Sequence, residues 1–366
     1  MRQTSWQDFD WGLLIIAISL TVIGVAMIHS ATLGAEDEIL ANAWRKQAIY
    51  AVGGVVLMVL VSVVDYRVLE SLQWPIYIAT LGTLVFTLLF GTSEIGSVRR
   101  FLYIGGLSIQ PSFPALIMLI VSQASLLARN APAPPGIQEF AASLVLTAIA
   151  SFLVFSQPNL STATLYIASW GVMIFASGVP LGYLAGVGGL GLAGLPVIWA
   201  NMDGYMRDRV FNFLDPELDP GAYYNVQQAL ISIGSGGLLG KGFATGTQSQ
   251  LHFLRVRHTD FIFSVICEEL GFVGAGLILT IFGVLLWRLL RIAANADDAT
   301  GRLIVTGVTA LIFYQLLINL GMNLKLIPVA GLPMPFISSG GSALVVTFIG
   351  LGLVESVATH QRRLEF

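Results

Sequence analysis

The residues that could do chemistry in this chain gather in one polar segment, from Asn201 to Asp260, between two long apolar segments. Elsewhere the chain avoids charge: Asp, Glu, Lys and Arg make up 11% of its residues, whereas soluble domains carry about 25%. Charge beside a lipid bilayer is costly, so it usually marks a functional site. The cations of this segment are Arg207, Arg209, Lys241, Arg255 and Arg257.

Asp260 is the strongest candidate for a catalytic group, because it follows Arg257-His258-Thr259 and directly precedes a long apolar segment. A carboxylate there could act as a general base. It could also hold a divalent cation, Mg²⁺ or Mn²⁺, since such an ion needs only one or two carboxylates when substrate phosphates complete its coordination. Two structural alternatives stay open, in which Asp260 caps the following helix or pairs with Arg207, Arg209 or Arg257. No organic cofactor is expected.

A run of glycines from Gly234 to Gly242 surrounds Lys241 and resembles a phosphate-binding loop at first sight. It lacks the Walker A spacing, because Ser235 occupies the place of the first glycine and Gly242 the place of the Ser or Thr after the lysine. ATP hydrolysis is therefore not expected. A turn that binds a diphosphate through its amides and an ordinary flexible turn both stay open. The candidate diphosphate contacts are Arg207, Arg209 and Lys241, followed by Arg100 and His258.

The composition predicts an all-α membrane protein, since 55% of the 366 residues are hydrophobic and the mean hydropathy is +0.80. We expect a single polytopic domain over residues 1–366, formed by a bundle of ten transmembrane helices. A large extracytoplasmic loop, residues 201–259, separates the seventh helix from the eighth, and the eighth is longer than one crossing needs, so it should tilt or protrude. The predicted spans are Trp11–Ile28, Gln47–Val64, Trp74–Phe90, Pro111–Leu127, Phe140–Phe155, Leu160–Ser177, Leu181–Ala200, Phe261–Leu290, Leu303–Met322 and Gly341–Thr359.

The distribution of Lys and Arg over the short loops favours cytoplasmic placement of both termini. Four outer segments, residues 97–112, 157–161, 201–260 and 327–342, are expected to be non-helical. Irregular backbone at membrane depth is tolerated only where protein buries it or water reaches it, so these segments should border a shared water-accessible cavity.

The net charge of −3 and the lack of a basic stripe give no sign of a nucleic-acid partner. Glu268 and Glu269 lie too far along the eighth helix to pair with Asp260, and we expect a structural role for them.

Ordered strings over nearly the whole chain resemble the SEDS family (shape, elongation, division and sporulation) of membrane glycosyltransferases. The string from Gly246 to Leu251 is closer to the elongation member of the family than to the division member. The strings are Leu214-Asp215-Pro216-Glu217, Ile233-Gly234-Ser235-Gly236-Gly237, Gly246-Thr247-Gln248-Ser249-Gln250-Leu251, His258-Thr259-Asp260-Phe261-Ile262-Phe263, Glu268-Glu269-Leu270-Gly271 and Gly340-Gly341-Ser342-Ala343.

This resemblance implies polymerisation of lipid II, a disaccharide-pentapeptide on undecaprenyl diphosphate, into peptidoglycan strands at the outer face of the bacterial inner membrane during cell elongation. The growing glycan chain would be transferred to the 4-hydroxyl of a lipid II sugar, and a single displacement would invert the anomeric centre. Asp260 matches the essential aspartate of the family, as general base or cation ligand. The implied partners are a class B penicillin-binding protein, the transpeptidase that cross-links new strands, and other membrane proteins of the elongation complex.

The chain departs from the family pattern at three positions that usually carry charge. Phe113 and Leu116 stand where relatives have Glu and Lys, and Asn159 stands where they have Asp. Losing an acid and a base together fits the exchange of a buried charge pair for apolar packing. Two other functions stay open: a flippase for a lipid-linked precursor, which charges and broken helices within the membrane would suit, and a non-catalytic scaffold for the transpeptidase.

Overall fold

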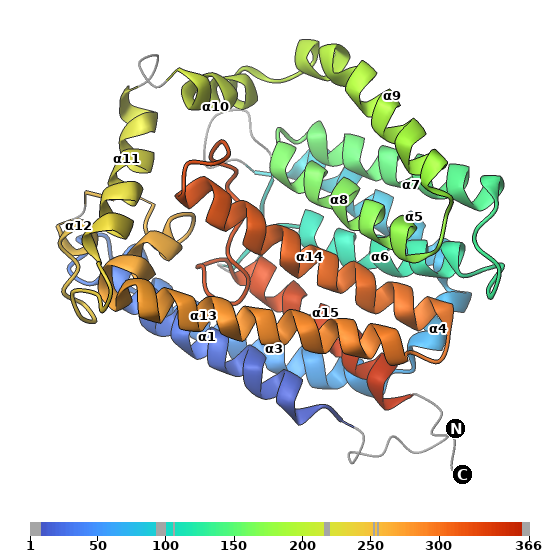
Figure 1. Ribbon diagram of the computed structural model, residues 1–366, viewed down its shortest axis with the longest axis horizontal. Helices are drawn as coiled ribbons and strands as arrows, with labels where there is room; N and C mark the ends of the chain where they lie inside the picture. Colours follow the sequence, from blue (N-terminus) through green and yellow to red (C-terminus); the bar gives the residue numbers. More distant parts are fainter. Residues whose placement is uncertain are drawn as a thin grey trace.

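The computed structural model describes residues 9–92, 100–104, 107–215, 220–251, 253–254 and 256–360, and it is predominantly helical (Figure 1). Every apolar segment predicted to span the membrane forms a helix. These helices are α1 (Trp11–Thr32), α3 (Ala43–Val63), α5 (Gln73–Phe90), α6 (Ser112–Leu127), α7 (Ile137–Phe155), α8 (Leu160–Ala176), α9 (Leu181–Ala200), α13 (Ile262–Asn295), α14 (Ala299–Asn323) and α15 (Gly341–Thr359). The shorter helices are α2 (Glu38–Ala41), α4 (Tyr66–Ser71), α10 (Gly204–Leu214), α11 (Pro220–Ser235) and α12 (Thr247–Gln250).

Eight helices within the described residues are long and apolar enough to cross a membrane. The other two apolar helices, α6 and α8, have 16 and 17 residues, close to the lower limit for a bilayer crossing of about 17 residues. An all-α membrane protein is therefore confirmed, and the count of ten spans stays a prediction.

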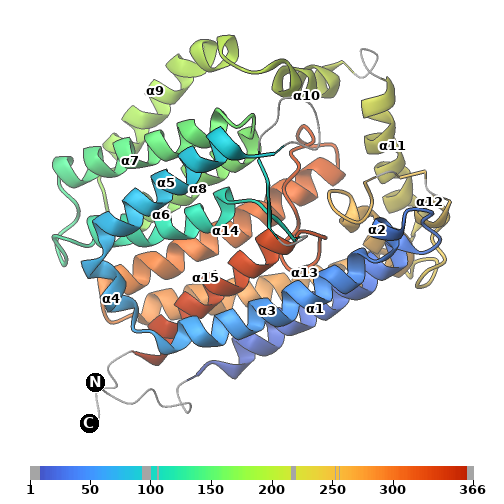
Figure 2. The same ribbon diagram turned by 180° about the vertical axis from the view of Figure 1, so that it is seen from behind.

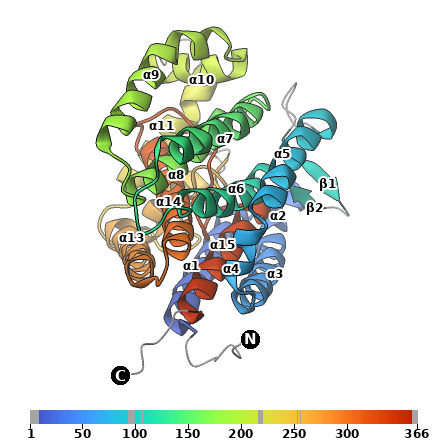
Figure 3. The ribbon, with the colours of Figure 1, turned by 90° about the vertical axis from the view of Figure 1, so that its right-hand side faces the viewer.

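The helices α14 and α15 form the centre of the bundle (Figures 1 and 2). Most of their residues are buried, because α15 packs against α3 on one side and α14 packs against α6, α8 and α13. In contrast, α9 has no buried residue and lies at the outer edge of the bundle (Figure 3). The connection between α14 and α15 lines the candidate site with Gly331, Pro333, Ser339 and Gly340.

The polar segment between α9 and α13 is helical in its first half, where α10 and α11 lie, so the prediction of irregular backbone is wrong there. In its second half, from residue 236 to residue 260, the described residues are irregular apart from the four-residue helix α12, as predicted. Asp203 caps α10 by accepting a hydrogen bond from the amide of Tyr205 at 3.0 Å, and α11 begins at Pro220. Both are ordinary helix-start signals, and they outweigh the polar composition. Arg255, Pro216 and Glu217 lie outside the described residues.

The long helix α13 is interrupted at Gly271, where φ is 68° and ψ is −169°. Beyond the break, the amides of Phe272 and Val273 donate hydrogen bonds to the carbonyls of Gly237 and Leu238 at 2.9 and 3.0 Å. The break therefore creates free backbone donors that the glycine-rich turn satisfies, as buried backbone requires. The unusual length predicted for this span thus reflects two helical pieces joined at a glycine.

In the segment 97–112, two short strands, β1 (Leu102–Ile104) and β2 (Leu107–Ile109), pair antiparallel ahead of α6. Only its residues from 100 onward, without 105 and 106, are described. The hairpin packs against the start of α15, where Ser342 links the two elements: the amide of Gln110 donates to its Oγ at 2.9 Å, and that hydroxyl donates to the carbonyl of Ser108 at 3.1 Å. The expected non-helical character of this segment is confirmed where it is described.

Close approach of α3 and α15 gives a prediction about stability. A Cβ atom at Gly352 would lie 2.6 Å from the carbonyl oxygen of Met58, which is backbone and cannot move aside, so overpacking should cost about 1–3 kcal/mol. Gly352→Ala should therefore lower the thermal unfolding midpoint in detergent. Gly53→Ala is the matched control, because a Cβ atom added there would meet nothing within 4 Å and alanine favours a helix over glycine by up to about 1 kcal/mol. Equal midpoints for the two variants would contradict this packing.

Candidate active site

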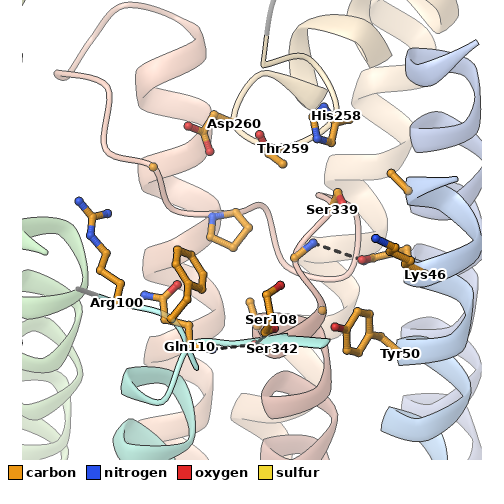
Figure 4. A pocket seen from close by; sticks show the side chains of 18 of the residues that line it. Lys46, Tyr50, Arg100, Ser108, Gln110, His258, Thr259, Asp260, Ser339 and Ser342 are labelled. Carbon is orange, nitrogen blue, oxygen red and sulfur yellow. Dashed lines mark hydrogen bonds between the residues drawn. The ribbon is translucent and has the colours of Figure 1, made fainter. Parts of the chain in front are cut away.

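A cavity of about 620 Å³ opens beside the segment that leads into α13. Its walls come from α2, α3, the β1–β2 hairpin, α10, residues 258–260 and the segment 331–343. Figure 4 shows the part of the lining that includes Lys46, Arg100 and Asp260. Three of the four outer segments predicted to meet at a shared cavity therefore do so. Pockets of about 300–1,000 Å³ accommodate small molecules and sugar-sized groups.

Asp260 lines this cavity, and neither structural alternative for it holds. The N-cap of α13 is Phe261 and carries no side-chain cap, so Asp260 does not cap the helix. No cation in the described part of the chain lies within the 4.0 Å of an ion pair from its carboxylate. Arg257 instead donates to the carbonyls of Ala31 and Leu254. The carboxylate thus has no structural bond that would account for its position.

Two arginines lie near Asp260 without forming an ion pair with it. Arg209 donates to the hydroxyl of Tyr205, and its guanidinium lies 4.6 Å from the centre of that ring. Arg100 lies 5.8 Å from the same ring and donates to the carbonyl of Pro158 at 2.9 Å. Tyr205 therefore holds both cations at one end of the cavity, beside the acid.

Burial sets the protonation of the groups beside the cavity. It raises the pKa of Asp260 above its ordinary value, while the charges of Arg209 and Arg100 act in the opposite direction. A carboxylate of raised pKa is a better proton acceptor. Burial, helped by the charge of Arg257, lowers the pKa of His258 to about 4, so this histidine is neutral near pH 7. Its Nδ1 is buried and has no hydrogen-bond partner among the described residues.

Sequence reasoning missed several residues that line the cavity. Lys46 on α3 lies on the side opposite Arg100, and Tyr50 lies one turn further along α3 (Figure 4). Tyr205, which orders the arginines, was also missed. The only sequence signal for Lys46 was a cation at the predicted outer end of a span, and it became a site residue only because α3 packs against α15.

A second cavity of about 200 Å³ adjoins the first and shares Arg100, Tyr205 and Arg209 with it. Residues 158–161 line it, which is the remaining outer segment predicted to border a cavity. The shared cationic wall means that a ligand held by the arginines can extend into either space.

The comparisons with known proteins agree with this architecture. The family model of the FtsW, RodA and SpoVE cell cycle proteins matches residues 10–363. The chain belongs to this family. Peptidoglycan glycosyltransferase MrdB of Escherichia coli (strain K12) is 38% identical over 367 residues, which cover 99% of this chain and 97% of that protein. The family is the one that the ordered strings indicate, so the resemblance is confirmed.

Solved structures of the SEDS family share the fold. The rod shape determining protein RodA of Thermus thermophilus matches with a TM-score of 0.73 and 30% identity, covering 98% of this chain and 99% of that one. A chain of a peptidoglycan synthase complex, described by its coordination of polymerization and crosslinking, matches with a TM-score of 0.81 and 31% identity. That match covers 98% of this chain and 100% of the other.

The positions where this SEDS protein lacks the usual charges are packed. Phe113 lines the cavity and is 3% exposed, and Leu116 is fully buried. Asn159 caps α8, since its side chain accepts a hydrogen bond from the amide of Thr162 at 3.3 Å. Apolar packing at Phe113 and Leu116 agrees with the exchange of a charge pair for hydrocarbon.

Two predicted diphosphate contacts do not reach the cavity. Arg207 donates to the carbonyl of Ala200 at the end of α9. Lys241 forms an ion pair with Glu268, with 2.8 Å between Nζ and Oε1. Glu268 is completely buried, so the lysine balances a charge inside the bundle. The structure therefore brings together Asp260, Arg209, Arg100 and His258 from the predicted set, and not Arg207 or Lys241.

The glycine run also serves packing. A Cβ atom at Gly236 would lie 1.9 Å from the carbonyl oxygen of Cys267, and one at Gly240 would lie 2.2 Å from that of Glu269. The amides of Lys241 and Gly242 already donate to the carbonyls of Glu268 and Glu269. Those two amides are thus not available for a diphosphate, and the turn is a docking element for α13.

The expected structural role of Glu268 and Glu269 agrees with their contacts. Besides Lys241, Glu268 accepts hydrogen bonds from the amides of Gln248 and Ser249. Glu269 accepts from the amide of Ala244 at 3.1 Å and from the hydroxyl of Ser30. Both carboxylates are therefore satisfied by the turn and its neighbours.

The Lys241–Glu268 pair gives a second prediction. Lys241→Met leaves the buried Glu268 carboxylate without its counter-charge, and such a loss costs about 1–3 kcal/mol. The unfolding midpoint should fall, and the double variant Lys241→Met/Glu268→Gln should recover part of the loss. Lys46→Met is the control, because Lys46 is exposed and has no ion pair within the described ranges, so its midpoint should not change. A Lys241→Met protein as stable as the wild type would remove this structural role.

Proposed function

We propose that this chain is a peptidoglycan glycosyltransferase that polymerises lipid II into glycan strands. The activity is that of relatives such as MrdB, whose name states it. The observation that carries the proposal is the Asp260 carboxylate, which lines a cavity of about 620 Å³ with no ion pair of its own in the described structure. A group kept free in such a place is suited to act on a substrate.

The reaction needs one base. The 4-hydroxyl oxygen of the acceptor sugar attacks the anomeric carbon of the growing chain, and the hydroxyl proton passes to the Asp260 carboxylate. The bond between that carbon and the diphosphate oxygen breaks, and the undecaprenyl diphosphate leaves with the electron pair. A single displacement inverts the anomeric centre. Glycosidases need two carboxylates, whereas here the diphosphate leaves without protonation.

Arg209 and Arg100 stabilise the charge that grows on the leaving diphosphate. They lie at the end of the cavity that adjoins the second, largely apolar cavity. A lipid-linked diphosphate held there would direct its sugar toward Asp260. Fixed positioning of the two sugars supplies much of the acceleration, as in other enzymes that hold both reactants.

A divalent cation fits the site only with help from the substrate. Within the residues that the structure describes, no group of three or more His, Cys, Asp or Glu side chains could hold a metal ion. Mg²⁺ is commonly held by one or two carboxylates plus phosphate oxygens, and Asp260 offers one carboxylate. As the alternative to its role as the base, Asp260 together with phosphate oxygens of the substrate would hold a Mg²⁺ or Mn²⁺ ion, which would neutralise negative charge on the leaving group.

The cellular setting follows from the same proposal. A multi-pass protein of the bacterial inner membrane with both termini in the cytoplasm would place the cavity at the outer face, where lipid II is used. A structural neighbour belongs to a complex that coordinates polymerization with crosslinking. The partner of this chain is accordingly a cross-linking transpeptidase, a class B penicillin-binding protein.

Asp260→Asn keeps the shape of the side chain and removes the base, so the rate of polymer formation should fall by about 10²–10⁴-fold. The assay gives purified protein, with its transpeptidase partner, labelled lipid II and Mg²⁺ or Mn²⁺, and separates products by gel electrophoresis. The control is Asp208→Asn, an exposed carboxylate on α10 that does not line the cavity, which should polymerise normally. If Asp260→Asn formed polymer at the wild-type rate, Asp260 would not be the general base. Lipid movement across vesicles without polymer would instead indicate a flippase.

The pH dependence of the polymerisation rate should show the effect of the Arg209 charge on the pKa of Asp260. Asp260 must be deprotonated to act, so the rate falls as the pH drops through its raised pKa. Arg209 lowers that pKa, so Arg209→Met should raise it further and move the acid limb of the rate profile to higher pH. The measurement is kcat/KM for lipid II between about pH 4 and about pH 9, because this ratio reports the pKa values of the free enzyme and the range begins near the ordinary pKa of a carboxyl group, about 4. An acid limb that stays in place would show that Arg209 does not act on this carboxylate.

A further inference from the structure

Three consecutive backbone carbonyls before α13 are each held by a polar group from another element. The carbonyl of His258 accepts a hydrogen bond from the amide of Ser339 at 2.9 Å. That of Thr259 accepts from the hydroxyl of Ser338 at 2.7 Å. The carbonyl of Asp260 is different, because side-chain amides from the central helix α14 donate to it. The bonds are 2.9 Å from Asn323 Nδ2 and 3.2 Å from Asn319 Nδ2.

The two asparagines form a clamp one helical turn apart on α14, and both are completely buried. The Oδ1 atom of Asn323 accepts from the amide and the hydroxyl of Ser264, at 3.2 and 2.7 Å. Asn319 also donates to the carbonyl of Leu332 at 3.0 Å. The clamp thus joins the residue before α13, the first turn of α13 and the segment that forms the cavity wall.

We propose that Asn319 and Asn323 are positioning residues for Asp260, which hold its peptide carbonyl so that its carboxylate points into the cavity. The inference rests on the proposed function, in which Asp260 is the base. Neither asparagine lines the cavity, so neither contacts the substrate, and both act through Asp260.

The two asparagines fix the backbone of Asp260 directly. Asp260 lies outside the hydrogen-bond ladder of α13, which begins at Ile262, so its backbone has no helical bond to fix it. Its side chain leaves from the Cα atom beside the clamped carbonyl. Rotation of that peptide would carry the carboxylate away from the acceptor hydroxyl, and a displacement of about 1 Å can cost about 10²-fold in rate.

The chain contains a matched control on the same helix. Gln315 lies one turn before Asn319 and is 1% exposed. Its amide nitrogen and oxygen have no hydrogen-bond partner among the described residues. Replacing Gln315 with leucine therefore makes a comparable change of polarity in the same buried helix without touching the clamp.

The first experiment separates binding from turnover. Asn319→Leu and Asn323→Leu should each lower kcat for lipid II polymerisation by about 10- to 100-fold and leave KM within about twofold of the wild type. Gln315→Leu should keep both parameters. Ser264→Ala is a milder variant that removes only the hydroxyl bond to Asn323, and it should lower kcat by a smaller factor while remaining folded. Wild-type kcat in both asparagine variants, or an equal fall in Gln315→Leu, would overturn the proposal.

A second readout does not depend on turnover. A water-soluble carbodiimide modifies protonated carboxyl groups, so the pH midpoint of Asp260 labelling, followed by mass spectrometry, reports the surroundings of this carboxyl. In the asparagine variants and in Ser264→Ala, release of the segment should rehydrate the carboxyl and move the midpoint to lower pH, and in Gln315→Leu the midpoint should match the wild type. Unchanged midpoints in all clamp variants would overturn the inference. If the wild-type protein makes no polymer, the proposed function fails, but the positioning of Asp260 by the two asparagines is still tested by the labelling midpoints.

Discussion

The cavity depends on how a short irregular segment, residues 258–260, is held without secondary structure of its own. Its three carbonyls are each satisfied by a group from outside the segment, as buried backbone at membrane depth requires. The bonding extends further, because Gln47 on α3 donates to the carbonyl of Ser338 at 3.0 Å and accepts from the amide of Gly340 at 3.2 Å. The helix α3 thus holds residues 338–340, which in turn hold residues 258 and 259, while α14 holds Asp260. A change in the packing of these helices would therefore move the Asp260 carboxylate.

Two other carboxylates near Asp260, those of Glu268 and Glu269, have hydrogen-bond partners. Glu268 and Glu269 lie only eight and nine residues after Asp260, yet Lys241, Ser30 and backbone amides of the turn surround them. Desolvated acids of this kind need such compensation. Asp260 has none on its carboxylate within the described residues, although its backbone is firmly bonded. Local surroundings, and not residue type, divide these acids into two that stabilise the fold and one that is free to react.

Much of the fold was accessible from the sequence, because hydropathy over about 20 residues is decided locally. Every apolar segment became a helix, and Asp260 was identified from the string around it. The helices within residues 201–259 were missed although Asp203 and Pro220 are local start signals, since the polar composition was given more weight. Lys241 was misplaced because its ion pair depends on a turn folding back onto α13. Lys46 and the asparagine clamp could not be found, because each matters only through contacts between distant elements.

The separation between Asp260 and its arginines suits the proposed displacement, in which Asp260 is the base and the arginines stabilise the leaving diphosphate. A direct ion pair would hold the carboxylate ionised but would make it a poor proton acceptor. Arg209 and Arg100 instead bond to Tyr205 and Pro158 and influence Asp260 from a distance. An incoming diphosphate would draw their charge to itself, so the carboxylate would become more basic when a donor is bound. As the bond to the diphosphate breaks, the same cations meet increasing negative charge. One pair of arginines can thus raise the reactivity of the base and stabilise the leaving group, provided that the structure keeps them apart from the acid.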